Sequence, residues 1–467
     1  MNLCQHSMVF SGRFRWSCIL LGLLLITSVG CTIHPDGENQ LRQVADKAGT
    51  PFTRPYTQRQ LPTLPPDASP EQLFHYAMLN NPGVEQAYWQ WQAAIEQIPQ
   101  AGTEMTVPMI SGNPALENGG FSAANTTLGL SNMTSSDIRW PSKPAADAQI
   151  ALQQARAAEW NFFSTSYTLR RDVRDAWFNY VQTSILLHLY QRRALLGDSL
   201  QSIMQSEVES GSGSTSDILS AQNDLIQIKI HIIQLQENKI EQLAMLNQLL
   251  GRAPDAPLAA PAEIPPIEWP SLDDSQLLAL MAARNPELAG LEEMESGGRI
   301  AIDRARMDYI PDFDLGASTS LDGGIQSFSA AIMVPLVRYQ AINASIRQAQ
   351  DQLNVTQAAL RDARNRLVAR VIIDVLAIRN DRTQIDIFQR SLLPQIRQQA
   401  SVAQMDYQQG QGSPQDQLMA QQTELDIQET LLNLQVDAAQ KLDDIEAVIA
   451  GPISPASPIA LTTKPNE

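Results

Sequence analysis

The stretch GSGSTSDILSAQ, residues 211–222, decides the fold because it returns later in the chain as GQGSPQDQLMAQ, residues 410–421. Seven of the twelve aligned positions are identical, which indicates an internal duplication. In both copies a helix-favouring run ends at the glycines and another begins after a Ser-x-x-Asp stretch. Glycine accepts the positive φ that closes a helix, and Ser or Asp oxygens accept the free amides of the next helix. Each copy therefore predicts a tight turn between two long antiparallel helices.

Two other interpretations of the glycine stretch are weaker. A flexible Gly/Ser linker does not explain why Asp217, Leu219 and Gln222 return as Asp416, Leu418 and Gln421. A phosphate-binding loop requires a Lys after its last Gly, and neither copy has one.

The duplication extends over most of the chain. Asn81-Pro82 and Asn285-Pro286 stand at corresponding places, where an Asn cap followed by Pro starts a helix. We expect a first repeat at residues 69–251 and a second at 275–451, joined by a proline-rich link at 252–274 and followed by a tail at 452–467. Within the repeats, helical stretches at about 145–210 and 341–409 would each reach roughly 100 Å at about 1.5 Å per residue.

Each repeat also carries a segment that favours strands. In the second, a hairpin at about 312–335, apolar residues alternate with polar ones on both sides of Asp322-Gly323-Gly324. In the first, at about 103–139, the alternation is poorer: Met105, Val107 and Met109, then Leu128 and Leu130, joined by an Asn/Gly-rich connection at 112–125. Each strand is long enough to cross a bilayer when tilted. A soluble, half-buried hairpin remains open for either segment alone.

The N-terminal region favours export and lipid attachment. Residues 1–30 have a positive start and a short apolar run typical of a signal peptide. The run ends at Ser28-Val29-Gly30-Cys31, which resembles a bacterial lipobox and predicts a covalent lipid on Cys31, with sorting to the outer membrane. Cys31 would be the only mature cysteine, so a disulfide is excluded. Prolines in residues 31–68 predict an extended tether, with disorder as the alternative.

Composition and motifs exclude several functions. A formal net charge of −17 disfavours a nucleic-acid partner, because phosphates require a basic face. The mature histidines are scattered and form no pair at metal-ligand spacing, so we expect no metal site, no other cofactor and no enzyme activity.

Four strands in one chain cannot close a membrane barrel, and an open edge in lipid leaves backbone groups unpaired. Neighbouring copies must complete it. Two chains would give eight strands and a filled interior, whereas three would give twelve and room for a lumen. Long helices arrayed in the same way would extend that lumen as a tube, which is a conduit.

The duplicated order, the paired Asn-Pro starts and the motif from Tyr407-Gln-Gln-Gly410 through Asp416-Gln-Leu418-Met-Ala420-Gln421 resemble the TolC family of outer-membrane efflux proteins. The resemblance implies a mainly α fold with a small β part. It implies a homotrimer with a twelve-stranded barrel in the outer membrane and a helical tunnel through the periplasm. It also implies two partners, a periplasmic adaptor and an inner-membrane pump.

Carried over by position, the resemblance makes the two glycine turns the periplasmic tips that receive the adaptor. These are Gly211, Gly213 and Ser214 in the first repeat and Gly410, Gly412 and Ser413 in the second. Asp416 matches a pore-facing aspartate. Some relatives carry a second aspartate three residues later, where this chain has Met419. The predicted pore constriction is therefore Asp416 with Met419, without a second acidic layer. Capping of the helix by Asp416 is an equal alternative to pore lining.

The predicted function is the outer-membrane channel of a tripartite efflux system, which conducts drugs or metal ions passively from the periplasm outward. A secretion duct for polypeptides shares the fold, and a lipid-anchored helical scaffold is a further alternative. A conduit leaves selection to the pump, so the sequence does not identify the cargo.

Overall fold

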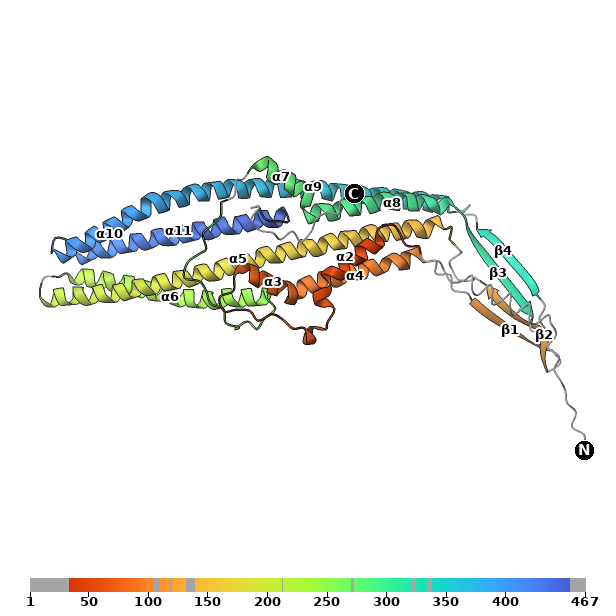
Figure 1. The fold of residues 1–467 in the computed structure, drawn as a ribbon, viewed down its shortest axis with the longest axis horizontal. Helices are drawn as coiled ribbons and strands as arrows, with labels where there is room; N and C mark the ends of the chain where they lie inside the picture. The colour runs from red at the N-terminus through yellow and green to blue at the C-terminus, as the bar shows by residue number, and fades with distance from the viewer. Residues whose placement is uncertain are drawn as a thin grey trace, which may run out of the picture. The chain divides into compact units, whose positions relative to one another are not determined.

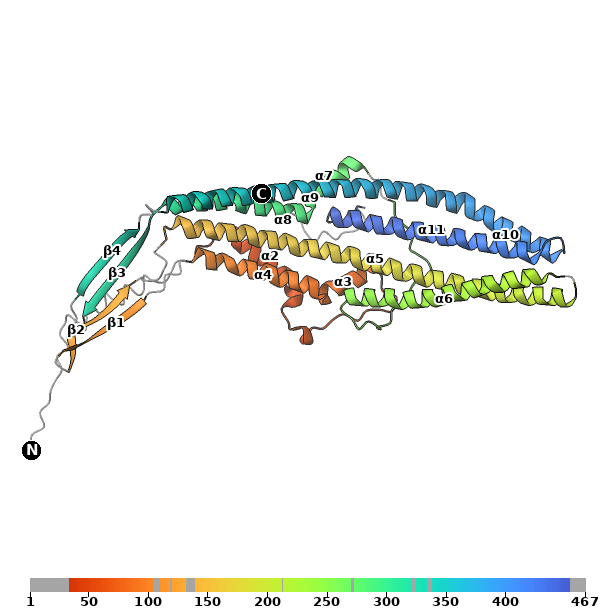
Figure 2. The same ribbon diagram turned by 180° about the vertical axis from the view of Figure 1, so that it is seen from behind.

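The computed structural model describes residues 33–103, 109–117, 120–131, 139–211, 213–269, 273–320, 325–333 and 338–453. Its elements follow the chain in this order (Figures 1 and 2): α2 Glu38–Ala48, α3 Pro70–Asn80, α4 Pro82–Gly102, β1 Met109–Glu117, β2 Gly120–Ser131, α5 Ser142–Glu209, α6 Thr215–Leu249, α7 Asp274–Arg284, α8 Pro286–Arg306, β3 Asp312–Ser320, β4 Ile325–Met333, α9 Tyr339–Ile387, α10 Leu393–Gln408 and α11 Pro414–Val448. Short 3₁₀ turns lie at Thr50–Phe52, Tyr56–Gln58 and Met307–Tyr309.

The chain divides into two compact units. One comprises Met1–Ala48, Trp89–Glu159 and Gly290–Arg361, and includes the strands. The other comprises Gly49–Tyr88, Trp160–Ala289 and Asp362–Glu467, and includes both glycine turns. The long helix α5 passes through both units.

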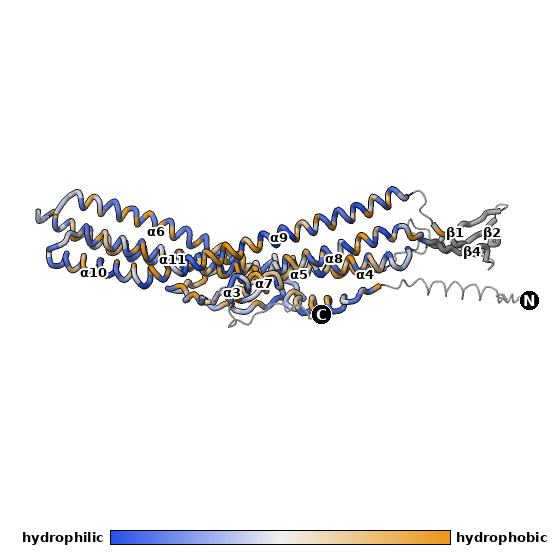
Figure 3. Tube along the Cα trace, turned by 90° about the horizontal axis from the view of Figure 1, so that it is seen from above, coloured by the Kyte–Doolittle hydropathy of each residue, from blue (hydrophilic) through white to orange (hydrophobic). Residues whose placement is uncertain are grey.

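The helices of the two repeats match in length. α3 and α7 have 11 residues, α4 and α8 have 21, and α6 and α11 have 35. Along α6 and α11 hydrophobic and hydrophilic residues recur in turn (Figure 3), because one side of each helix packs against neighbours and the other side faces solvent. None of the helices in the described ranges combines the length and apolarity that a membrane-spanning helix requires.

The two Asn-Pro starts do more than cap a helix. Asn81 Oδ1 accepts the amides of Gly83 and Val84, and Asn285 Oδ1 accepts the amide of Leu288. The amide nitrogen of each side chain reaches the end of the last long helix of its repeat, α6 or α11: Asn81 Nδ2 donates to Leu249 O at 2.9 Å and Asn285 Nδ2 to Val448 O at 2.8 Å. Each Asn therefore closes its own repeat by joining a helix start to a helix end.

The strands form one antiparallel sheet in the order β1-β2-β3-β4. In β3 and β4 the alternation gives the expected hairpin, with Phe313 opposite Ile332. The first hairpin corrects the prediction, because most of the expected connection at 112–125 is strand. Its register shifts between Asn113 and Ala115, around Pro114, which has no amide to donate. Met105, Val107 and the turn at 322–324 lie outside the described residues.

Helix α2 also corrects a prediction, because residues 31–68 are not an extended tether throughout. Pro35 and Pro51 flank α2 without interrupting it, and Leu41 and Ala45 on one of its faces are buried. Ile33 N donates to Gly102 O at the end of α4. The segment between Ile33 and Ala48 is therefore packed against its unit.

The expected long helix at 341–409 is interrupted once. A π-helical turn at Phe388–Leu392 separates α9 from α10. Pro394 follows it, and its ring nitrogen cannot donate to the carbonyl of residue 390. The wider turn accommodates the missing hydrogen bond without ending the helical path.

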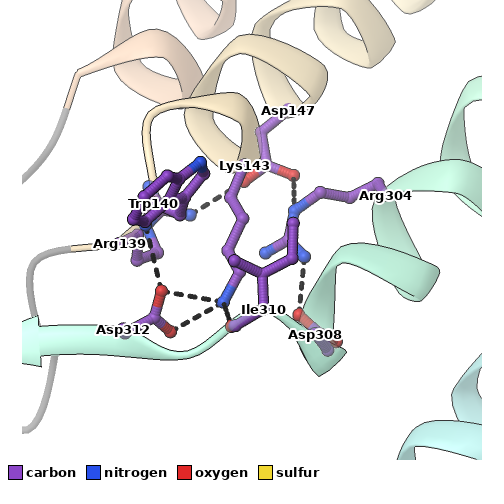
Figure 4. A network of polar contacts seen from close by, with 8 residues as sticks. All are labelled: Arg139, Trp140, Lys143, Asp147, Arg304, Asp308, Ile310 and Asp312. Carbon is purple, nitrogen blue, oxygen red and sulfur yellow. Dashed lines mark hydrogen bonds and ion pairs between the residues drawn. The ribbon is translucent and has the colours of Figure 1, made fainter. Parts of the chain in front are cut away.

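A polar network fastens the start of α5, in the first repeat, to the start of β3, in the second (Figure 4). Lys143 Nζ, which is buried, donates to Ile310 O at 2.9 Å and to both oxygens of Asp312 at 2.8 Å. Trp140 N also donates to Asp312. A second chain of ion pairs beside it joins Arg139, Asp147, Arg304 and Asp308. The entry of β3 is thus fixed by charges from the other repeat.

Candidate functional site at the helical tips

The first tip, residues 211–214, joins α5 to α6. Gly211 has a φ of 79°, in the left-handed region that favours glycine. Its amide donates to Val208 O, and the amide of Gly213 donates to Glu207 O, both at 3.0 Å. A Cβ at Gly213 would lie 2.8 Å from the backbone nitrogen of Val208. Both glycines are therefore required by the backbone.

The second tip, residues 410–413, joins α10 to α11 with nearly the same backbone. Gly410 has a φ of 72°, and its amide donates to Tyr407 O at 3.0 Å. The amide of Gly412 donates to Asp406 O at 3.0 Å. These bonds are the counterparts of those at the first tip.

The two tips differ in how the following helix starts. In the second, Asp416 N donates to Ser413 Oγ at 3.1 Å while Asp416 Oδ2 accepts Ser413 N at 3.2 Å, a reciprocal capping box. In the first, Ser214 makes no side-chain hydrogen bond to the start of α6. The Ser-x-x-Asp pattern occurs in both, yet only one copy uses it as a cap.

The tips of the two repeats come together in one unit and enclose a shallow pocket of about 630 Å³. Tyr407 Oη donates to Glu207 Oε1 at 3.2 Å across it. Below the pocket, Leu418 of α11 is buried with residues of the first helical pair: Leu200, Met204, Ile218 and Ala221. The structure therefore brings together Gly213, Ser214, Gly410, Gly412 and Ser413, which all line the pocket.

The pocket is negatively charged. Glu207 and Asp217 line it, and none of the described residues in its lining is Lys or Arg. Burial, followed by the hydrogen bond to Glu207, raises the pKa of Tyr407 above its usual value. Tyr407 therefore stays a neutral donor beside the carboxylate at neutral pH.

Asp416 and Met419 lie on the first turns of α11, outside the pocket lining. Asp416 is fully exposed, and the hydroxyl of Ser413, then its amide, lower the pKa of the Asp416 carboxyl. Met419 has 58% of its surface exposed. Within one chain Asp416 acts as a cap, and a ring of carboxylates would require further copies of the chain.

The other predicted features do not add residues to this site. In the described part of the chain, no three His, Cys, Asp or Glu side chains group so that they could hold a metal ion. The signal peptide at 1–30 and Cys31 lie outside the described residues. Sequence reasoning missed the Tyr407–Glu207 contact. The sequence held one signal for this contact, which is Tyr407 three residues before Gly410.

Residues 277–451, almost all of the second repeat, match the family model described as outer membrane efflux protein. Among solved structures, CusC is similar with a TM-score of 0.70 and 18% identity, over 86% of this chain and 97% of its own. The MtrE outer membrane channel of Neisseria gonorrhoeae gives 0.68 and 17%, over 82% and 89%. A membrane protein from Pseudomonas aeruginosa gives 0.71 and 18%, over 83% and 91%. No curated protein sequence matches the chain.

At these identities the structural similarity shows the fold. The described chain thus has the duplicated, mainly helical fold of TolC-like outer-membrane channels, with the predicted four-stranded sheet. The sequence of its second repeat matches the outer membrane efflux protein family as well. The resemblance inferred from the glycine turns is confirmed, and the outer-membrane location predicted from the sequence agrees with this class.

Proposed function

We propose that this chain is the outer-membrane channel of a tripartite efflux system, which conducts small molecules passively from the periplasm to the outside. The observation that carries the proposal is the pairing of two helical tips in one unit with a four-stranded sheet elsewhere in the same chain. In several copies arrayed around one axis, such helices would form a tube and the strands a closed barrel.

Self-association is supported by surfaces that one chain leaves uncovered. Strands β1 and β4 end the sheet, so each presents an edge that another copy can pair with. Helix α6 carries a second apolar seam, opposite to the one that packs on α5. Its exposed members recur at steps of seven, four, three and seven: Leu219, Ile226, Ile230, Ile233 and Ile240. This is the spacing of a coiled-coil contact. A homotrimer with twelve strands satisfies both surfaces.

The tip pocket supports docking of a periplasmic adaptor. Its carboxylates, Glu207 and Asp217, attract a partner surface that is positively charged. The backbone carbonyls and hydroxyls of the glycine turns add acceptors. We infer that the adaptor contacts both tips of one chain, and that an inner-membrane pump supplies selection and energy.

The first test is the assembly itself. Purified from outer membranes in detergent, the full-length protein is expected to run as a trimer and to give discrete conductance steps in a planar bilayer. Release as a soluble monomer when Cys31→Ser removes the lipid site, with no conductance, would instead support a lipid-anchored scaffold.

The second test separates capping from pore lining at Asp416. Asp416→Asn removes the charge, Ser413→Ala removes the cap but keeps the carboxylate, and Asp217→Asn is the matched change at the first tip. If Asp416 lines the channel, only Asp416→Asn alters the block of conductance by divalent cations. Equal effects of Asp416→Asn and Ser413→Ala would assign Asp416 to capping alone.

The third test identifies the partner. A photo-crosslinking residue placed at Ser214 is expected to capture an adaptor of a drug or metal efflux pump in intact cells. Placement at exposed Asp303, in the other unit, is the control. Capture of a polypeptide-secretion adaptor would assign the chain to a secretion duct.

A further inference from the structure

Helices α5 and α11 meet in one unit along a seam crowded with charged groups, which the channel function does not use. From α5 come three arginines, each with a carboxylate partner. Arg170 reaches Glu446 at 2.9 Å and Glu71 of α3 at 2.8 Å. Arg174 Nε lies 2.6 Å from Asp443 Oδ1. Arg171, the third, is engaged by Asp172 at 2.6 Å.

The same seam includes groups from α9. Arg370 reaches Asp444 of α11 at 2.8 Å and Asp374 at 3.3 Å. Lys441 of α11 binds Asp381 at 2.9 Å and also pairs with the exposed Asp437.

The carboxylates outnumber the cations. Leaving out the more exposed Asp172 and Asp437, seven carboxylates share the seam with five cations. The seven carboxylates are Glu71, Asp175, Asp374, Asp381, Asp443, Asp444 and Glu446. The five cations are Arg170, Arg171, Arg174, Arg370 and Lys441. An excess of negative charge in partly buried surroundings is unfavourable unless a proton or a cation neutralises part of it.

Asp443 and Asp175 are carboxylates of the seam whose buried oxygens lack an aligned hydrogen-bond donor, although Asp443 keeps its ion pair with Arg174. Asp443 has a side chain that is only 2% exposed, and neither of its oxygens has a well-aligned hydrogen-bond donor. Asp175 Oδ1 is buried and has no hydrogen-bond partner. A protonated carboxyl would supply the missing donor to a neighbouring oxygen, whereas a second charge would add repulsion.

We propose that Asp175 and Asp443 form a proton-binding joint between α5 and α11, which takes up protons in mildly acidic solution and then holds the two helices together. No group of three His, Cys, Asp or Glu side chains among the described residues could hold a metal ion, whereas a proton needs no such group. Since α11 continues to the second tip at Asp416, about 40 Å away at roughly 1.5 Å per residue, the joint fixes the base of that helix.

The pKa values agree in direction. Burial is the largest influence and raises the pKa of both Asp443 and Asp175 to about 7. For Asp443, Arg174 opposes this rise, while Glu446 and Asp175 add to it. For Asp175, Asp444 and Asp172 add to the rise, while Arg171 and Arg174 oppose it. The native state therefore binds more protons than the unfolded chain between the ordinary Asp value and about pH 7. Stability from the joint is present at the acidic end and is lost as the pH rises through about 7.

The test is thermal unfolding of the full-length protein in detergent. Wild type is expected to lose on the order of 5 °C in Tm between about pH 6 and about pH 8.5. Asp443→Asn should remove at least a third of that loss. Glu159, in the other unit, also has a pKa raised by burial to about 7 and accounts for part of the remainder. Asp426→Asn, an exposed change on the same helix, should leave the loss unchanged.

The same loss in Asp443→Asn as in wild type would overturn the proposal. If Asp443→Asn does not fold, Asp175→Asn serves in its place. Hydrogen exchange of the wild type provides a local reading: protection of residues 436–448 should fall with rising pH more than protection of α6 does. An equal change in both would also overturn the joint. A protein that conducts nothing but keeps this behaviour would refute the proposed function and leave the joint standing.

Discussion

The two helical tips share a backbone but not the side chains that support it. Gly211 and Gly410 have φ values of 79° and 72°, and equivalent amides donate to equivalent carbonyls. Yet the second tip has a reciprocal cap between Ser413 and Asp416, whereas Ser214 caps nothing. Both copies have kept the positive φ that glycine adopts readily, whereas their side-chain contacts have diverged.

The divergence has a physical origin in how the two repeats pack. Leu219 and Leu418 occupy corresponding positions, but Leu219 is exposed while Leu418 is buried among residues of the first repeat. The second tip thus buries Leu418 against the first repeat, whereas the first tip does not bury Leu219 against the second. Identical local motifs therefore have different surroundings, and different substitutions should damage them.

The largest difference in stability between matched substitutions is expected directly after α6 and α11, at the end of each repeat. Gly251 and Ala450 stand at corresponding positions with φ values of 65° and 51°. A Cβ at Gly251 would lie 2.8 Å from Asn80 O, so Gly251→Ala should destabilise the protein by about 2 to 4 kcal/mol. Ala450→Gly should change stability by less than about 1 kcal/mol. Urea unfolding of both variants measures the contrast, and equal losses would show that the two ends are equivalent.

The next largest loss of stability is expected from substitutions of the tip glycines. Gly213→Ala places a Cβ 2.8 Å from Val208 N, whereas Gly412→Ala places one 3.2 Å from Tyr407 N. We expect a cost of about 1 to 3 kcal/mol for the first and about 1 kcal/mol for the second. Hydrogen exchange at each tip reports the local loss directly. A larger loss of protection at the second tip would contradict this ranking.

These contrasts also show how far the sequence alone could lead. The turns, the Asn-Pro starts and the helix lengths could be predicted because each depends on local chemistry at Gly, Pro or Asn. The first hairpin could not. The described residues of its Asn/Gly-rich stretch pair only within the β1–β2 hairpin, and that hairpin joins the sheet through Thr127–Ser131 of β2, which pair with β3 nearly two hundred residues away. Pairing over that distance leaves no local pattern.

Helix α2 was missed for the opposite reason. Flanking prolines gave a local signal for extended chain, and burial of Leu41 and Ala45 outweighed it. At the site, the sequence identified both glycine turns but not their meeting across Tyr407 and Glu207. That contact depends on how two hairpins pack, which no single motif encodes.

The caps provide a smaller and more specific test. Ser413→Ala removes the hydroxyl that accepts Asp416 N and should cost about 1 kcal/mol, lost mainly as fraying of the first turn of α11. Ser214→Ala should cost almost nothing, because Ser214 makes no such bond. The Ser413 contact lowers the pKa of Asp416, so its contribution is present above the ordinary Asp value and is lost as the pH falls through the lowered one. Protection of the first turns of α6 and α11, compared at about pH 7 and about pH 3, measures both effects.

The smallest effect concerns the contact that joins the tips. Tyr407→Phe removes one hydrogen bond at a partly exposed site and should cost only about 0.5 kcal/mol. The raised pKa of Tyr407 means that its bond to Glu207 persists below the ordinary Tyr value and is lost as the pH rises through the raised one. Absorbance titration of the phenols should therefore lose one late-titrating group in Tyr407→Phe, and Glu207→Gln should shift that group toward its ordinary value. An unchanged titration in Glu207→Gln would mean that burial alone holds the proton on Tyr407. The two tips would then be joined by the packing of Leu418 and not by this bond.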